Sequence, residues 1–199
     1  MNIKFLNFIE PYLSYIDSGK LFRKPFSWLY ILLAALNAIL PFYVLYKVID
    51  SGIFSQASYG IGVAKYVFAF MFVWLVLCVA CWFGFQIWWN RKDKVLLTSE
   101  EGSEFPVTPA ISHFFQTFGE WLGTYIAVVG FGFSLFGTIF LGSNAHSLSN
   151  AMNLPFNTGL MGIGGIVLFP LLGFAIIVLF RYFAELCRCL ASIANNTKK

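Results

Sequence analysis

Charged side chains at the ends of apolar segments are the first candidates for chemistry in this chain. Glu120 directly precedes one apolar run, and Arg181 directly follows the last one. Glu185 is one helical turn from both Arg181 and Arg188, so these three share a helix face. Antiparallel helices would bring Glu120 to the depth of Arg181, so we expect Glu120 to approach Arg181 or Arg188. Such a cluster is typical of interfacial salt bridges; a proton, ion or headgroup site is the functional alternative.

A second group of polar candidates lies at the centre of apolar runs. Asn37 precedes Pro41 by four residues, and proline cannot donate a hydrogen bond to the carbonyl of Asn37. Pro170 has the same effect on the carbonyl of Ile166. Helices broken at membrane depth can form binding sites, but kinks joined by an interhelical hydrogen bond are the more common outcome. We therefore expect a structural role and keep a binding site as the alternative.

Cysteine and histidine residues do not form a metal or redox site in this reading. Cys78 and Cys81 have the spacing of a redox pair, but they lie deep in an apolar run without a neighbouring histidine or carboxylate. His113 and His146 fall on opposite sides of the membrane in the predicted topology. No phosphate loop, nucleophile elbow or zinc spacing occurs. We expect no catalysis, no metal and no cofactor.

Composition indicates a membrane protein. Of its 199 residues, 59% are hydrophobic and 11% are charged, whereas soluble domains carry about a quarter charged residues. The net charge of +4 is modest, and the basic residues cluster beside apolar segments, which favours topology over nucleic-acid binding. The lipid bilayer is therefore the expected partner, and nucleic acid is not.

The fold class predicted is all-α, an integral membrane protein with four transmembrane helices and an N-terminal amphipathic interfacial helix. A helix needs about 20 apolar residues to cross the hydrocarbon. We expect one membrane domain over 1–199, with an interfacial arm, four spans and a tail, at 1–24, 26–46, 66–90, 121–141, 160–180 and 181–199. Trp28, Trp88, Trp89 and Trp121 are expected to form an aromatic belt at one interface. The segment from Gly142 to Gly159 is expected to be a compact loop.

Basic residues predict the orientation. Lys47 and Lys65 are the only 2 of the 13 lysines and arginines that would lie outside if the N-terminus is inside. The excess of positive charge on the other side predicts cytoplasmic N- and C-termini.

Glycines predict a helix-packing face in the third span. Gly119 and Gly123 form a G-x-x-x-G pair, and Gly123, Gly130 and Gly137 recur every seven residues. Glycines let two helix backbones approach closely. Gly162, Gly165 and Gly173 of the fourth span offer a partner face, and a second protein is the alternative. A glycine-lined solute path is the functional alternative.

Three stretches resemble a family of four-span bacterial inner-membrane proteins without an assigned activity. They are FQIWWNRKDK at 85–94, HFFQTFGEWLG at 113–123 and FRYFAELCRCLASIANNTKK at 180–199. The resemblance, which includes Arg181 and Glu185, covers mainly the C-terminal half and implies a multi-pass protein of the bacterial inner membrane.

Two functions fit these features. The first is a non-catalytic membrane subunit or scaffold that packs with other membrane protein subunits or self-associates. The alternative is a small transporter or channel that uses polar sites at Asn37 and Pro41 and at Glu120 and Arg181. A water-filled path between the spans would favour transport.

Overall fold

The computed structural model describes residues 9–17, 20–56, 62–97, 107–152 and 162–197. Every regular element in these ranges is helical, which confirms the predicted all-α fold. The elements are α1 (Glu10–Asp17), α2 (Lys20–Asp50), α3 (Ile53–Gln56), α4 (Val63–Arg91), the 3-10 helix η2 (Lys94–Leu97), α5 (Val107–Leu141), the 3-10 helix η3 (Gly142–Asn144), α6 (Ala145–Ala151) and α7 (Gly164–Thr197).

Four of these helices, α2, α4, α5 and α7, are long and apolar enough to cross a membrane. They contain 31, 29, 35 and 34 residues. At a rise of about 1.5 Å per residue, they are about 44 to 53 Å long, which exceeds the roughly 30 Å of hydrocarbon. Helices α2, α4 and α5 contain their expected spans and extend beyond them, whereas α7 begins inside its expected span of 160–180 and extends beyond its end.

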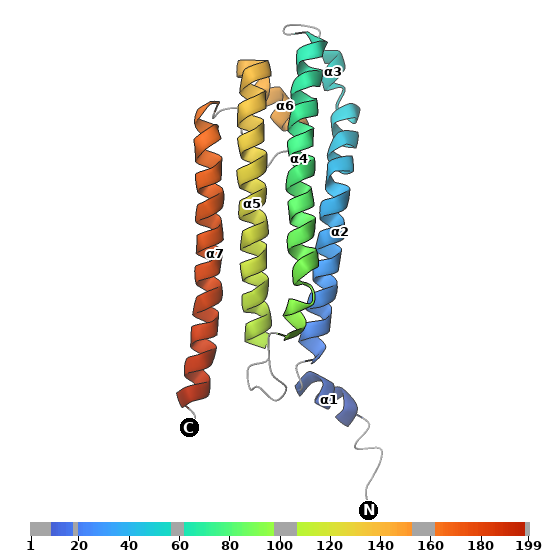
Figure 1. The fold of residues 1–199 in the computed structure, drawn as a ribbon. Helices are drawn as coiled ribbons and strands as arrows, with labels where there is room; N and C mark the ends of the chain where they lie inside the picture. The colour runs from blue at the N-terminus through green and yellow to red at the C-terminus, as the bar shows by residue number, and fades with distance from the viewer. Residues whose placement is uncertain (1–8, 18–19, 57–61, 98–106, 153–161, 198–199) are drawn as a thin grey trace, which may run out of the picture.

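The four long helices stand side by side as an open layer (Figure 1). Their order across the layer is α7, α5, α4 and α2. α5 packs against α7 on one side and α4 on the other, α2 packs on α4, and α2 touches α5 only slightly. We call the end of the layer that holds α1 and the last turns of α7 the terminal end, and the opposite end the loop end.

The short helix α1 lies at the terminal end, at an angle to α2 (Figure 1). Ile9, Tyr12 and Leu13 are more than half exposed there. A short amphipathic helix in this position suits the surface of a bilayer.

Two apolar clusters hold α2, α4 and α5 together. The cluster at the loop end is closed by residues of the short helices α3 and α6, where Ile53 and Leu148 are buried. Helix α6 and the preceding η3 occupy the first part of the segment expected to be a loop, so that expectation is wrong for 142–151. Residues 153–159 of the same segment lie outside the described ranges.

The second cluster, at the terminal end, is aromatic. Trp88 is fully buried, 5.1 Å from the ring of Tyr30 and 5.9 Å from that of Phe114, measured between ring centroids. Trp88 therefore belongs to the core and not to an interfacial belt, contrary to expectation. Trp28 and Trp89 are exposed, as residues of a belt would be. The rotation of Trp88 toward α2 and α5 decides its environment.

Glycines bring α5 into close contact with α7. A Cβ atom at Gly123 would collide with the backbone oxygen of Gly173, and a Cβ atom at Gly173 would collide with the backbone oxygen of Gly123. Gly119 and Gly130 leave room for Phe180 and Phe169 of α7. The fourth glycine of the predicted face, Gly137, instead lies near Ala145 at the start of α6.

The partner glycines of α7 are used unequally. Gly173 makes the backbone contact just described, and Gly165 lies against Ser134 of α5. Gly162 has a φ of 48° before the start of α7, with open space where its side chain would be. The close crossing of α5 and α7 therefore centres on Gly123 and Gly173.

Adding one methyl group at this crossing tests the packing. We expect Gly123→Ala and Gly173→Ala each to lower the free energy of unfolding by about 1–3 kcal/mol, because a backbone oxygen cannot move aside. The matched control is Gly164→Ala in α7, where a Cβ meets no atom within 4 Å. Unfolding in mixed micelles would measure all three; equal stability of the three variants would contradict this packing.

Candidate functional site

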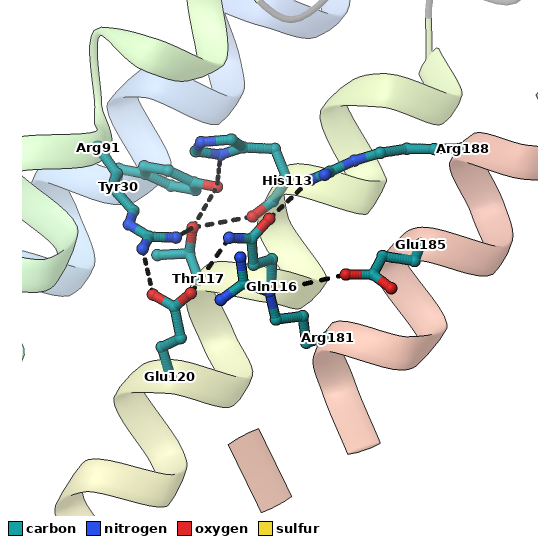
Figure 2. Close-up of polar contacts among 9 residues, drawn as sticks. All are labelled: Tyr30, Arg91, His113, Gln116, Thr117, Glu120, Arg181, Glu185 and Arg188. Atoms are coloured by element: carbon teal, nitrogen blue, oxygen red, sulfur yellow. Dashed lines mark hydrogen bonds and ion pairs between the residues drawn. The ribbon is translucent and has the colours of Figure 1, made fainter. Parts of the chain in front are cut away.

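Five polar side chains form a stripe on the terminal end of α5. Neighbouring members of the stripe are one, three or four positions apart in the sequence, so they occupy adjacent faces of the helix. They are Ser112, His113, Gln116, Thr117 and Glu120. Ser112 and Thr117 are completely buried. The other long helices each place one polar side chain against this stripe (Figure 2).

The side chain from α4 is Arg91. Its guanidinium forms an ion pair with Glu120 and donates a second hydrogen bond to the hydroxyl of Thr117 at 3.5 Å. The Arg91 and Glu120 side chains are 25% and 17% exposed, so water screens the pair only partly. The pair thus joins α4 to α5 at the terminal end.

The side chain from α2 is Tyr30, which is fully buried. Its hydroxyl lies 2.9 Å from Nδ1 of His113 and 3.4 Å from the hydroxyl of Thr117. Thr117 in turn donates to the backbone carbonyl of His113 at 2.8 Å. The Tyr30 hydroxyl therefore takes part in two hydrogen bonds, which fix α2 against the turn of α5 that contains His113 and Thr117.

The side chain from α7 is Arg188. Its Nε donates to the hydroxyl of Ser112 at 2.9 Å, and one terminal nitrogen donates to Oε1 of Gln116 at 2.7 Å. The Ser112 hydroxyl donates to the carbonyl of Ala184 at 2.7 Å. These bonds run in both directions between α5 and α7, so they fix the register of the two helices.

Gln116 joins the two halves of this network. Its amide nitrogen donates to Oε1 of Glu120 at 3.2 Å while its oxygen accepts from Arg188. Both carboxylate oxygens of Glu120 therefore have a partner, because Oε2 is paired with Arg91. A carboxylate engaged at both oxygens is suited to holding helices together and poorly suited to acting as a free general base.

Glu120 was expected to approach Arg181 or Arg188, but it pairs directly with neither of them. Glu120 pairs with Arg91, and it reaches Arg188 only through Gln116. Arg181 pairs with Glu185 at 3.7 Å on the surface of α7, where both side chains are about 60% exposed. Depth along the bundle was estimated from residue counts, but the rotation of α7 turns Arg181 away from α5.

The predicted midplane group is joined to its neighbours by hydrogen bonds. Asn37 is 4% exposed, and its Oδ1 accepts a 2.8 Å bond from Nε1 of Trp121 in α5. Its amide donates to the carbonyl of Leu33 at 2.8 Å. Gly84 of α4 provides the space, because a Cβ there would collide with Asn37. This arrangement links α2 to α5 past the backbone of α4.

The two prolines of the prediction lie inside continuous helices. Pro41 is within α2, and its carbonyl accepts a 3.0 Å hydrogen bond from Nε1 of Trp74 in α4. Pro170 is within α7 and lines an apolar groove between α4, α5 and α7. Asn37, Pro41 and Pro170 therefore do not converge on one site.

Sequence reasoning missed most of the network. The predicted site residues do not include Tyr30, Arg91, His113, Gln116 or Thr117. One signal was available, namely the polar stripe opposite the apolar stripe of Ile111, Phe114, Phe115 and Phe118. Nothing comparable marks Tyr30, which stands alone in an apolar run.

Metal binding finds no support in the part of the chain that the structure describes, which contains no group of three His, Cys, Asp or Glu side chains able to hold an ion. Cys78, Cys81, Cys187 and Cys189 are free thiols. Comparison with known proteins found no matching family model, no matching curated protein and no matching solved structure.

The ion pair between α4 and α5 can be measured by a double-mutant cycle. We expect Arg91→Met and Glu120→Leu each to cost about 1–3 kcal/mol, since each leaves a charged partner unsatisfied. The double variant should lose less than the sum, by about 1 kcal/mol or more. Arg181→Met with Glu185→Leu is the control, with an expected coupling of about 0.3–0.5 kcal/mol. Equal coupling in the two cycles would refute the structural role of Glu120.

The fit of Asn37 against Gly84 predicts a second coupling. Gly84→Ala alone should destabilise the protein by about 1–3 kcal/mol, because the new methyl group displaces the Asn37 amide. In an Asn37→Ala background the same substitution should cost less, since the nearest obstacle is gone and only Nε1 of Trp121, at 2.9 Å, remains in the way. Unfolding of the four proteins in mixed micelles measures both values; an equal cost in the two backgrounds would be inconsistent with this geometry.

Proposed function

We propose that the protein is a non-catalytic integral membrane subunit or scaffold, which joins a larger assembly or self-associates. The observation that carries this proposal is the one-sided packing of α7. Of the residues in its apolar stretch, 11% are buried, against 28%, 39% and 44% for α2, α4 and α5. α7 packs on α5 alone among the long helices, so its outer face is free for another protein.

The use of polar side chains supports a structural role. Tyr30, Arg91 and Arg188 each bond a different part of the α5 stripe. Asn37 bonds Trp121. Side chains that hold helices together at membrane depth contribute to assembly, and they leave few groups available for chemistry.

We further propose a bacterial inner membrane with both termini in the cytoplasm. The excess of lysine and arginine at the terminal end supports this orientation. Arg91, Lys92, Lys94, Arg181 and Arg188 are all at that end, whereas Lys47 and Lys65 are at the loop end. The resemblance of the C-terminal half to bacterial inner-membrane proteins supports the compartment.

One observation favours transport as the second candidate. A cavity of about 360 Å³ between α2 and α4 is lined by Asn37, Pro41, Trp74, Cys81 and Phe85, among others. Its walls are mostly apolar, and the Asn37 side chain already has a partner at each end. The cavity therefore suits an apolar molecule better than an ion, and flux of such a molecule into liposomes, abolished by Asn37→Leu, would support transport.

The assembly proposal is tested by measuring the mass of the extracted protein. Protein extracted from its native membrane in a mild detergent should run above the monomer mass in native mass spectrometry. Phe174→Ala on the outer face of α7 should lower the associated fraction, because it removes a large apolar contact. The matched control is Phe42→Ala on α2, since Phe174 and Phe42 are 66% and 67% exposed. A strictly monomeric protein without a copurifying partner would overturn the proposal.

A further inference from the structure

A groove runs along α4 and α5 on one side of the layer, and its terminal end is polar. This part has a volume of about 360 Å³. Its polar lining consists of Gln86, Asn90, Arg91, Lys94 and Thr124. Phe83 and Ile87 are its apolar lining residues.

The groove continues toward the loop end as an apolar part of about 550 Å³. Leu75, Val76 and Val79 of α4 line it, with Val128 and Phe131 of α5 opposite. Val79 lies one turn from Phe83, and Val128 lies one turn from Thr124, so both parts use the same helix faces. The cationic part and the apolar part therefore lie end to end along the same faces of α4 and α5.

We propose that this groove binds one anionic phospholipid. Its phosphate meets Lys94 and the amides of Gln86 and Asn90, and an acyl chain lies along Ile87, Phe83 and Val79. This site goes beyond the proposed assembly role and does not depend on it.

Charge complementarity selects an anionic headgroup. Glu120 neutralises Arg91, so Lys94 supplies the uncompensated positive charge among the described side chains of the groove. The neighbouring Lys92 is directed elsewhere, with its ammonium 3.7 Å above the ring of Trp89 and 3.8 Å from the carboxylate of Asp93. A zwitterionic headgroup would bring its own cation beside Lys94 and bind less well.

The length of the groove suits one acyl chain. From Asn90 to Val79 the helix rises about 16 Å, which is about half of the roughly 30 Å of hydrocarbon. A phosphate placed at Asn90 and Lys94 thus lies at headgroup level, and the chain ends near Val79 at the bilayer centre. The apolar part then follows the same path into the other leaflet.

The test is a titration of the intact protein in dodecyl maltoside micelles with dioleoyl phosphatidylglycerol, counted by native mass spectrometry. Lys94→Gln should weaken binding of the first lipid about fivefold, the effect of one lysine near an anionic lipid. Val79→Trp, at an exposed position of α4, should also weaken it by blocking the chain. The matched control, Lys92→Gln, should leave binding unchanged.

Other probes identify the source of the phosphate. Dioleoyl phosphatidylcholine should bind at least about fivefold more weakly than phosphatidylglycerol, since it carries no net charge. Glycerol phosphate, which has no acyl chain, should not displace the lipid. The proposal is overturned if Lys94→Gln and Lys92→Gln weaken binding equally, if Val79→Trp has no effect, if the two lipids bind equally, or if glycerol phosphate competes.

Discussion

In the bilayer, water cannot satisfy polar groups, so each buried polar side chain depends on a partner within the protein. At the terminal end of the layer, α5 supplies hydrogen-bond partners for polar side chains of the other three long helices. Its polar stripe from Ser112 to Glu120 receives Tyr30 from α2, Arg91 from α4 and Arg188 from α7 (Figure 2). Because all three attach to one helix, the positions of α2, α4 and α7 depend on α5. The network therefore defines both the neighbours of α5 and their register.

The apolar contacts of α5 also differ between the side that faces α7 and the side that faces α4 and α2. Its glycine face at Gly123 and Gly130 admits the backbone and aromatic side chains of α7. Its other side packs with Trp88 of α4 and Tyr30 of α2 into an aromatic core. Two buried groups, Nε1 of Trp88 and the hydroxyl of Ser134, have no hydrogen-bond partner among the described residues. Dispersion contacts dominate there, and the bonds that fix register lie in the α5 stripe and at Asn37.

The sequence predicted what depends on position along a helix and missed what depends on rotation around it. The four spans and α1 followed from long apolar runs and helical spacing. The approach of α5 and α7 at Gly123 and Gly173 was among the alternatives, because glycine spacing marks a helix face. The predicted partner of Glu120 was wrong. Residue counting gives the depth of a side chain, but it cannot show that Arg91 of α4, rather than Arg181 of α7, faces the carboxylate. Trp88 was misplaced for the same reason.

The distance between α2 and α7 tests the open layer most directly. Spin labels at exposed Ile39 in α2 and Phe174 in α7 would report it in lipid nanodiscs, after replacement of the four native cysteines. Adjacent helices pack with axes 8–10 Å apart, so a layer with α5 and α4 in between predicts a separation of about 20 Å or more. A separation of about 10 Å would mean that α2 and α7 are neighbours in a closed bundle, and it would contradict the central position of α5.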